Sequence, residues 1–72
     1  MVALGPRERQ VIEILLTGAD NAEIAKELGI ARRTVKAHLN KLFIKFGITD
    51  DTRIKRVVLA VKAYRMQRAG EL

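Results

Sequence analysis

The sequence contains no cysteine and no serine, and it has one histidine and one proline. Without cysteine, neither a disulfide nor a thiolate metal site can supplement the core, and no Ser or Cys nucleophile is available. The single histidine, His38, cannot form a histidine pair or a multi-histidine metal site. No apolar run approaches the roughly 20 residues of a membrane span, and no charged start leads into an apolar signal segment. We therefore expect a cytoplasmic protein that is not an enzyme, holds no cofactor or metal and does not enter a membrane.

Basic residues outnumber acidic ones and gather in the second half of the chain. The 72 residues include fourteen Lys and Arg against eight Asp and Glu, which gives a net charge of +6. No acidic residue lies between Glu27 and Asp50 or between Thr52 and Gly70, whereas the first 27 residues are nearly balanced. Charge placed in this way favours one basic face for a polyanion such as a phosphate backbone. An ordinary solvated surface is the alternative.

Four helical stretches are indicated by capping residues, glycines and apolar spacing. Pro6 suits the first position of a helix, and Asn21 is a good N-cap. Gly18, Gly29 and Gly47 suit helix ends. The chain shows neither strand alternation nor a linker long enough to separate domains. We therefore predict one all-α domain, residues 1–72, with helices at 6–17, 22–28, 32–46 and 52–68, the last of them capped by Thr49, Asp50 or Asp51.

The second and third stretches have the spacing of a helix-turn-helix, in which a short turn presents a recognition helix to the major groove. Residues 28–31 form the corner, and Gly29 supplies the turn. Ala25 is small where the two helices cross, and Val35 fills the angle between them. A generic helical hairpin is the alternative.

Five segments resemble the LuxR-type DNA-binding domain of bacterial transcription regulators of the LuxR/FixJ type: LGPRER at 4–9, NAEIA at 21–25, LGI at 28–30, TVKAHL at 34–39 and KFGI at 45–48. The resemblance implies a four-helix domain that binds double-stranded DNA as a dimer, usually at promoters. Such domains are often attached to a receiver or ligand-sensing domain, and we expect neither within these 72 residues. The chain departs from the family at Gly5 and Ala31, where Ser or Thr is usual, and at Ile44 and Asp51, where basic or polar residues are common.

The third stretch has a single apolar stripe and a polar face opposite to it. On that outer face Lys36 suits guanine, Asn40 suits adenine and the Ala37 methyl suits thymine. The resemblance implies base reading at the same three positions, and a merely solvated face is the alternative. His38, at the edge of the stripe, is expected to bond to backbone. We expect phosphate contacts, which set register without reading sequence, from Asn21, Arg32, Arg33, Thr34, Lys41 and Lys45. For Asn21, capping of the second stretch without contact to DNA is the alternative.

The last stretch has apolar residues on two sides. We expect the first side to cover the other helices; it consists of Ile54, Val57, Val58, Val61 and Tyr64. We expect the second side to pair with the same helix of another subunit; it consists of Val58, Leu59, Lys62, Ala63 and Met66. A single exposed Leu59, or docking on a regulatory domain outside this sequence, is the alternative to a homodimer.

Three classes of function compete. The first is a sequence-specific transcriptional regulator, or the DNA-binding domain of one, with double-stranded DNA and RNA polymerase as partners. The second is a helical adaptor that binds an acidic protein surface, for which the outward Ile44 is the best support. The third is a basic amphipathic helix, residues 53–68, that lies on anionic membrane. The first is the main hypothesis because the DNA-reading residues share one helix face.

Overall fold

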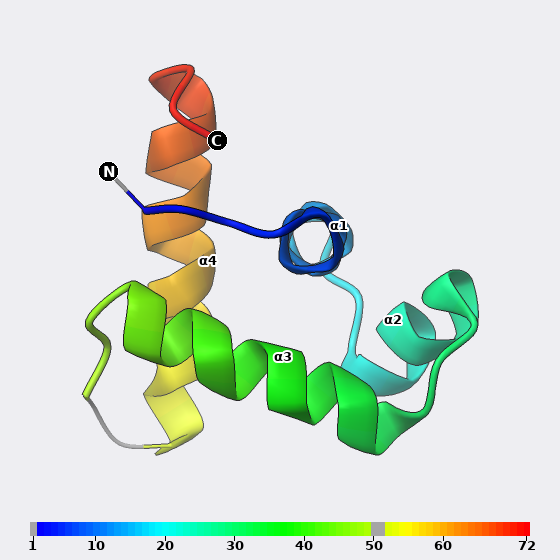
Figure 1. Cartoon of the computed structure of the whole chain (residues 1–72). Helices are drawn as coiled ribbons and strands as arrows, with labels where there is room; N and C mark the ends of the chain where they lie inside the picture. The colour runs from blue at the N-terminus through cyan, green and yellow to red at the C-terminus, as the bar shows by residue number, and fades with distance from the viewer. Residues whose placement is uncertain (1, 50–51) are drawn as a thin grey trace.

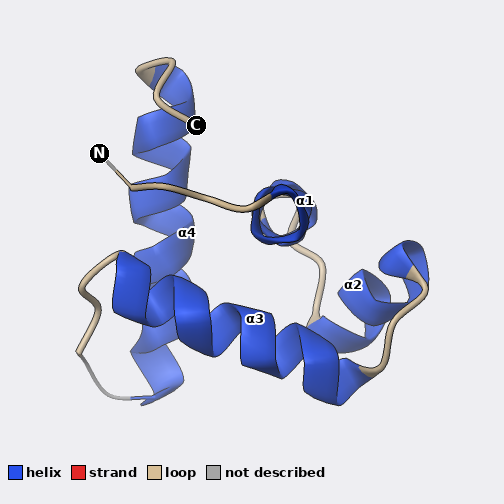
Figure 2. Cartoon of the chain, viewed as in Figure 1, coloured by secondary structure: helices blue, strands red, loops and turns tan. Residues whose placement is uncertain are grey.

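The structure is a computed structural model that describes residues 2–49 and 52–72, with the side chains of all of these except residues 52 and 53. Four α-helices follow one another: α1 (Pro6–Leu15), α2 (Asn21–Leu28), α3 (Arg32–Lys45) and α4 (Thr52–Arg68). Helices and loops account for all the described residues, and no strand occurs among them (Figure 2). The predicted all-α class is therefore confirmed. The expected caps Asp50 and Asp51 lie outside the described residues.

The helix bounds differ from the prediction by two residues or fewer. The first helix ends at Leu15, not at residue 17, because Thr17 and Gly18 donate to the carbonyls of Ile14 and Leu15 in a tight turn at 3.0 Å each. Gly18 then takes a φ of +91°, which favours glycine. The third helix ends at Lys45, one residue early, where Phe46 leaves the helical conformation.

The start of α2 corrects the predicted capping residue. Asp20, not Asn21, is the N-cap: its Oδ1 accepts a hydrogen bond from the Glu23 amide at 2.8 Å, and Oε1 of Glu23 accepts from the Asp20 amide at 3.1 Å. This reciprocal pair is a capping box, which needs an acidic or amide residue three positions after the cap. Asp20 has such a partner and Asn21 does not. Asn21 therefore becomes the first helical residue, and its side chain is available for other contacts.

The corner between α2 and α3 has the predicted form. Gly29 caps α2 with a left-handed φ of +67°, and the Ile30 amide donates to the Ala25 carbonyl at 3.0 Å. This hydrogen bond closes the helix end before the chain turns into α3 (Figure 1). Ala25 and Val35 are buried where the two helices meet. The helix-turn-helix thus rests on the same residues that indicated it in the sequence.

The core lies where α1, α2 and α3 converge and α4 covers them. Its largest fully buried side chains are Val11, Ile12, Ile24, Val35, Leu42 and Leu59. In Figure 1, α4 stands against one end of α3 and beside α1, away from α2. None of the described helices is long and apolar enough to cross a membrane.

The orientation of α4 is opposite to the prediction. Leu59 and Ala63 have no exposed surface, and Val58 and Met66 pack partly buried against the same core. Lys62 donates to the Phe46 carbonyl at the end of α3, at 3.3 Å. The residues expected to face a second subunit therefore hold α4 on its own domain. The stripe expected to point inward is instead exposed: Ile54, Val57, Val61 and Tyr64.

The number of apolar residues on each side of α4 does not decide which side is buried. Ala63 has a small side chain, so the helix axis can approach the core closely at that point. Leu59, one turn earlier, then enters the core completely. The β-branched and aromatic residues on the other side remain outside. The predicted interface of Val58, Leu59, Lys62, Ala63 and Met66 is thus corrected.

Candidate nucleic-acid interface

The outer face of α3 displays the three residues predicted to read bases. Lys36, Ala37 and Asn40 are all exposed, whereas Val35, Leu39 and Leu42 on the opposite side are buried. Because residues three and four apart share a helix face, the three side chains form one continuous strip. Their backbone is fixed by the buried stripe behind them.

Basic residues surround this strip. α3 contains no acidic residue, and Arg32, Arg33 and Lys41 are exposed, while Thr34 is half-buried. Ala31 occupies the N-cap position in extended conformation, with no side-chain hydrogen bond to the helix. The first amides of α3 therefore lack the carboxylate or hydroxyl cap that closes many helix starts. Together, the uncapped amides, Arg32 and Arg33 give the N-terminal half of α3 a positive potential.

Lys45 has a structural partner that the sequence did not reveal. Its Nζ lies 2.6 Å from Oε1 of Glu8 and 3.0 Å from the Ala3 carbonyl. The Glu8 carboxylate also accepts from the Gly5 amide at 2.9 Å. The hydrogen bond from Lys45, and then that from Gly5, hold the pKa of Glu8 below its ordinary value of 4.5, although burial acts against them. Lys45 thus ties α3 to the start of α1, and its ammonium is engaged by Glu8 and Ala3. For this reason we do not propose Lys45 as a phosphate contact.

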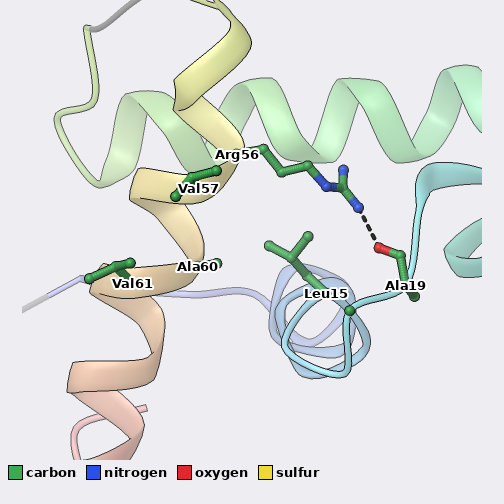
Figure 3. A pocket seen from close by; sticks show the side chains of 7 residues that line it. Leu15, Ala19, Arg56, Val57, Ala60 and Val61 are labelled. Carbon is green, nitrogen blue, oxygen red and sulfur yellow. Dashed lines mark hydrogen bonds between the residues drawn. The ribbon is translucent and has the colours of Figure 1, made fainter.

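Arg56 of α4 is a functional candidate that the sequence reasoning missed. Its guanidinium donates to Oδ1 of Asn21 and to the carbonyl of Ala19. Figure 3 shows the side chain reaching from α4 across to the segment before α2, where it meets the Ala19 carbonyl. The half-buried Arg56 joins two elements separated by more than thirty residues. Only its place in a basic run marked it in the sequence.

A shallow groove of about 300 Å³ connects this contact with the outer face of α3. The groove lies between the start of α2, α3 and the start of α4. Its lining combines cations and amides with an apolar floor: Asn21, Lys36, Leu39, Asn40, Phe43 and Arg56. Beside it, Nζ of Lys55 lies 5.6 Å from the centroid of the Phe43 ring, within cation–π distance. The groove therefore brings two predicted base-reading residues next to the predicted phosphate contact Asn21.

A second, apolar hollow of about 280 Å³ lies on the far side of Arg56, between the end of α1 and α4 (Figure 3). Leu15 and Ala60 line it, together with Val57 and Val61 of the exposed α4 stripe. The hollow thus continues the exposed apolar surface of α4 toward α1.

His38 sits at the edge of the core, as predicted, and is half-buried. Among the described residues no hydrogen bond from its ring to backbone is found, so that part of the prediction lacks support. The described part of the chain also holds no cluster of His, Asp and Glu side chains that would bind a metal ion.

The fixed corner between α2 and α3, with a buried stripe on one side of α3 and a basic strip on the other, defines a helix-turn-helix domain. The family model for GerE, described as bacterial regulatory proteins of the luxR family, matches residues 2–58. The chain belongs to this family. The resemblance seen in the sequence is thereby confirmed.

Individual relatives agree with the family. The chain is 39% identical over 56 residues to the transcriptional regulatory protein MctR of Rhizobium johnstonii. The aligned region covers 78% of this chain and 26% of that protein. It is 43% identical over 53 residues to the transcriptional regulatory protein UhpA of Escherichia coli, covering 74% of this chain and 27% of the relative. The chain thus spans about a quarter of the length of these relatives. No solved structure matches it significantly.

Proposed function

We propose that the chain binds double-stranded DNA sequence-specifically, as a transcriptional regulator or as the DNA-binding domain of one. The observation that carries this proposal is the outer strip of α3, where Lys36, Ala37 and Asn40 are exposed opposite a buried stripe. An α-helix of this kind fits the major groove of B-DNA. The names of MctR and UhpA, both transcriptional regulatory proteins, support the same function.

Within the major groove each residue of the strip has a distinct chemical role. The Lys36 ammonium donates to O6 or N7 of guanine, and the Asn40 amide forms a paired contact with adenine. The Ala37 methyl contacts the thymine methyl. These three positions therefore determine which sequence is bound.

Phosphate contacts surround the strip and hold α3 in register. Arg32, Arg33 and Lys41 are exposed cations on either side of it, and Thr34 adds a hydroxyl. Asn21 contributes from the start of α2, across the groove shared with Lys36. These contacts supply affinity that depends on salt and is independent of sequence.

Two copies bind together on DNA through the exposed face of α4. Ile54, Val57, Val61 and Tyr64 are 44% to 61% exposed and follow one another at intervals of three, four and three residues. This is the a/d spacing of paired helices, with β-branched residues at both a positions. In a twofold dimer the same surface patch of each copy meets the other, and this stripe suits such pairing. We therefore assign α4 of a second copy as the partner of the stripe. The two recognition helices then meet half-sites about one helical turn apart.

The stripe is short, and this sets how strong the pairing is. Four side chains over three helical turns bury much less than the roughly 1,200 Å² typical of a stable interface. The paired state therefore forms when DNA holds two copies next to each other, which raises their effective concentration. In free solution the monomer predominates.

One observation favours the adaptor alternative. Ile44, at 79% exposure, lies on α3 beyond the base-reading strip and has no role in the DNA proposal. An adaptor would bind an acidic protein through the same basic face. A salt titration separates the two functions. The cations Arg32, Arg33 and Lys41 of two copies make about six phosphate contacts, which give a log–log slope of roughly −5 for duplex DNA.

The direct experiment is selection of bound sequences from a random DNA pool. Sequence-specific binding is expected to enrich a short motif that contains guanine next to adenine and thymine, in two copies at fixed spacing. A pool without enrichment after repeated rounds would refute sequence-specific reading.

A further inference from the structure

The contact between Arg56 and Asn21 determines which way the Asn21 amide faces. The arginine side chain has only donors, so the Asn21 atom that faces Arg56 must be an acceptor. The amide oxygen can accept and the amide nitrogen cannot, so Oδ1 faces Arg56. The same guanidinium also donates to the Ala19 carbonyl, so two hydrogen bonds hold the guanidinium plane in place. With Oδ1 held toward α4, the Asn21 amide nitrogen is left with two donor hydrogens on its other side.

The Asn21 side chain lies at the edge of the groove between α2, α3 and α4. Asn21 lines this groove together with Lys36 and Asn40, both on the DNA-facing strip of α3. Arg56 also lines it, so Asn21 shares the groove with two cationic side chains, Lys36 and Arg56. The groove is thus supplied with donors and positive charge, and the described residues that line it include no carboxylate.

The carboxylates near the start of α2 are engaged elsewhere. Oδ1 of Asp20 and Oε1 of Glu23 accept the two capping hydrogen bonds. Glu23 lines a different hollow, with Lys26 and Glu27. An anion in the groove therefore meets Asn21, Lys36 and Arg56 and is set apart from these two acids.

We infer that Arg56 is a positioning residue that turns the Asn21 amide into a donor for one DNA phosphate, seated in the groove beside Lys36. The inference rests on the proposed function. If the Asn21 amide were reversed, its oxygen would face the phosphate and repel it. Arg56 thus links the position of α4 to the register of α3 on the DNA backbone.

The test is a double-mutant cycle on binding to a short random-sequence duplex, because phosphate contacts are independent of sequence. Asn21→Ala is measured in the wild-type chain and in Arg56→Met, which has a side chain of similar length and no donor. We expect Asn21→Ala to weaken wild-type binding about fivefold, the loss of one partly solvent-exposed hydrogen bond of typical net strength. In the Arg56→Met background the same change is expected to cost less than about twofold. Equal losses in the two backgrounds would overturn the inference.

Arg65→Met is the matched control for charge, since Arg65 is an exposed arginine on the same helix. In the Arg65→Met background Asn21→Ala is expected to keep its full fivefold effect. If wild type shows no salt-dependent binding to the duplex, the proposed function fails. If wild type binds and the losses are equal, the function stands and only the role of Arg56 fails.

Asn21→Asp provides a second readout that does not depend on Arg56→Met folding. The aspartate still accepts from Arg56 but has no donor for a phosphate. We expect thermal stability at or above that of wild type together with a loss of duplex binding of more than fivefold. Unchanged duplex affinity in this variant would overturn the inference.

Discussion

Nζ of Lys45 and Oε1 of Glu8 lie 2.6 Å apart and join the end of α3 to the first turn of α1. The Glu8 side chain is 9% exposed and the Lys45 side chain 39% exposed, so the pair is partly shielded from water. The Gly5 amide adds a second donor to the same carboxylate oxygen. This arrangement stabilises the ionised form of Glu8 in the folded state.

Stability is therefore expected to fall in acid. Because the folded-state pKa of Glu8 is below its ordinary value of 4.5, its contribution is complete above that pH and is lost as the pH falls through the folded pKa. We expect Glu8→Gln to lower the free energy of unfolding at neutral pH by about 1 kcal/mol, a value reduced by the partial exposure of Lys45. Urea unfolding of Glu8→Gln and of wild type at several pH values measures the difference in their free energies of unfolding.

The difference between Glu8→Gln and wild type should shrink below pH 4.5. Glu13→Gln is the matched control, because Glu13 is an exposed glutamate on the same helix. Its effect is expected to be small at every pH. A difference for Glu8→Gln that persists unchanged into strong acid would show that the ion pair is not its source.

The two sides of α4 are expected to respond differently to truncation. Leu59→Ala removes a fully buried side chain and should lower the free energy of unfolding by about 2–5 kcal/mol. Val57→Ala removes part of a side chain that is 61% exposed and should change the free energy of unfolding by less than about 0.5 kcal/mol. Chemical denaturation of both variants gives the comparison. Similar losses of stability in the two variants would contradict the finding that the Leu59 side of α4 is buried and the Val57 side exposed.

Pairing on DNA is tested by Val61→Asp, which places a charge in the middle of the exposed stripe. The domain should stay folded, because Val61 does not belong to the buried core. Sedimentation on a two-half-site duplex is expected to show one chain per duplex at concentrations where wild type binds two. Glu13→Gln should bind as wild type does. Two chains per duplex for Val61→Asp would contradict pairing through this face.

The N-cap of α3 offers a stabilising change. Ala31 has the extended conformation of a capping residue but no side chain to accept from the first turn. Ala31→Ser should raise the free energy of unfolding by about 1 kcal/mol. Ala37→Ser, in the middle of the same helix, is the control and should lower it by about 0.5 kcal/mol. Equal effects at the two positions would mean that residue 31 does not cap the helix.

The sequence predicted the parts of the fold that local rules decide. α3 has a single apolar side, so Val35, Leu39 and Leu42 identified its buried face and, by difference, the exposed strip of Lys36, Ala37 and Asn40. The Gly29 corner followed from one residue's preference for positive φ. Such features depend on neighbours within a few positions.

Features that depend on distant contacts were not predicted. α4 has apolar residues on both sides, and only packing against the other three helices decides that Leu59 is buried and Val57 is not. The partners of Lys45 and Arg56 lie 37 and 35 residues away from them, beyond any local pattern. From the sequence alone, Lys45 is therefore predicted to contact phosphate and Arg56 is one cation of a basic run; only the fold places their partners beside them.

Lys36 gives the most direct test of base reading by α3. Its truncation removes a donor to guanine and should weaken binding to the selected site by about 1–3 kcal/mol, with a smaller loss on random duplex DNA. Arg33→Ala removes a phosphate contact and should weaken both about equally. The measurement is the ratio of the two dissociation constants for wild type, Lys36→Ala and Arg33→Ala at one salt concentration. We predict that the ratio falls in Lys36→Ala and is unchanged in Arg33→Ala; an unchanged ratio in Lys36→Ala would contradict base reading by this helix.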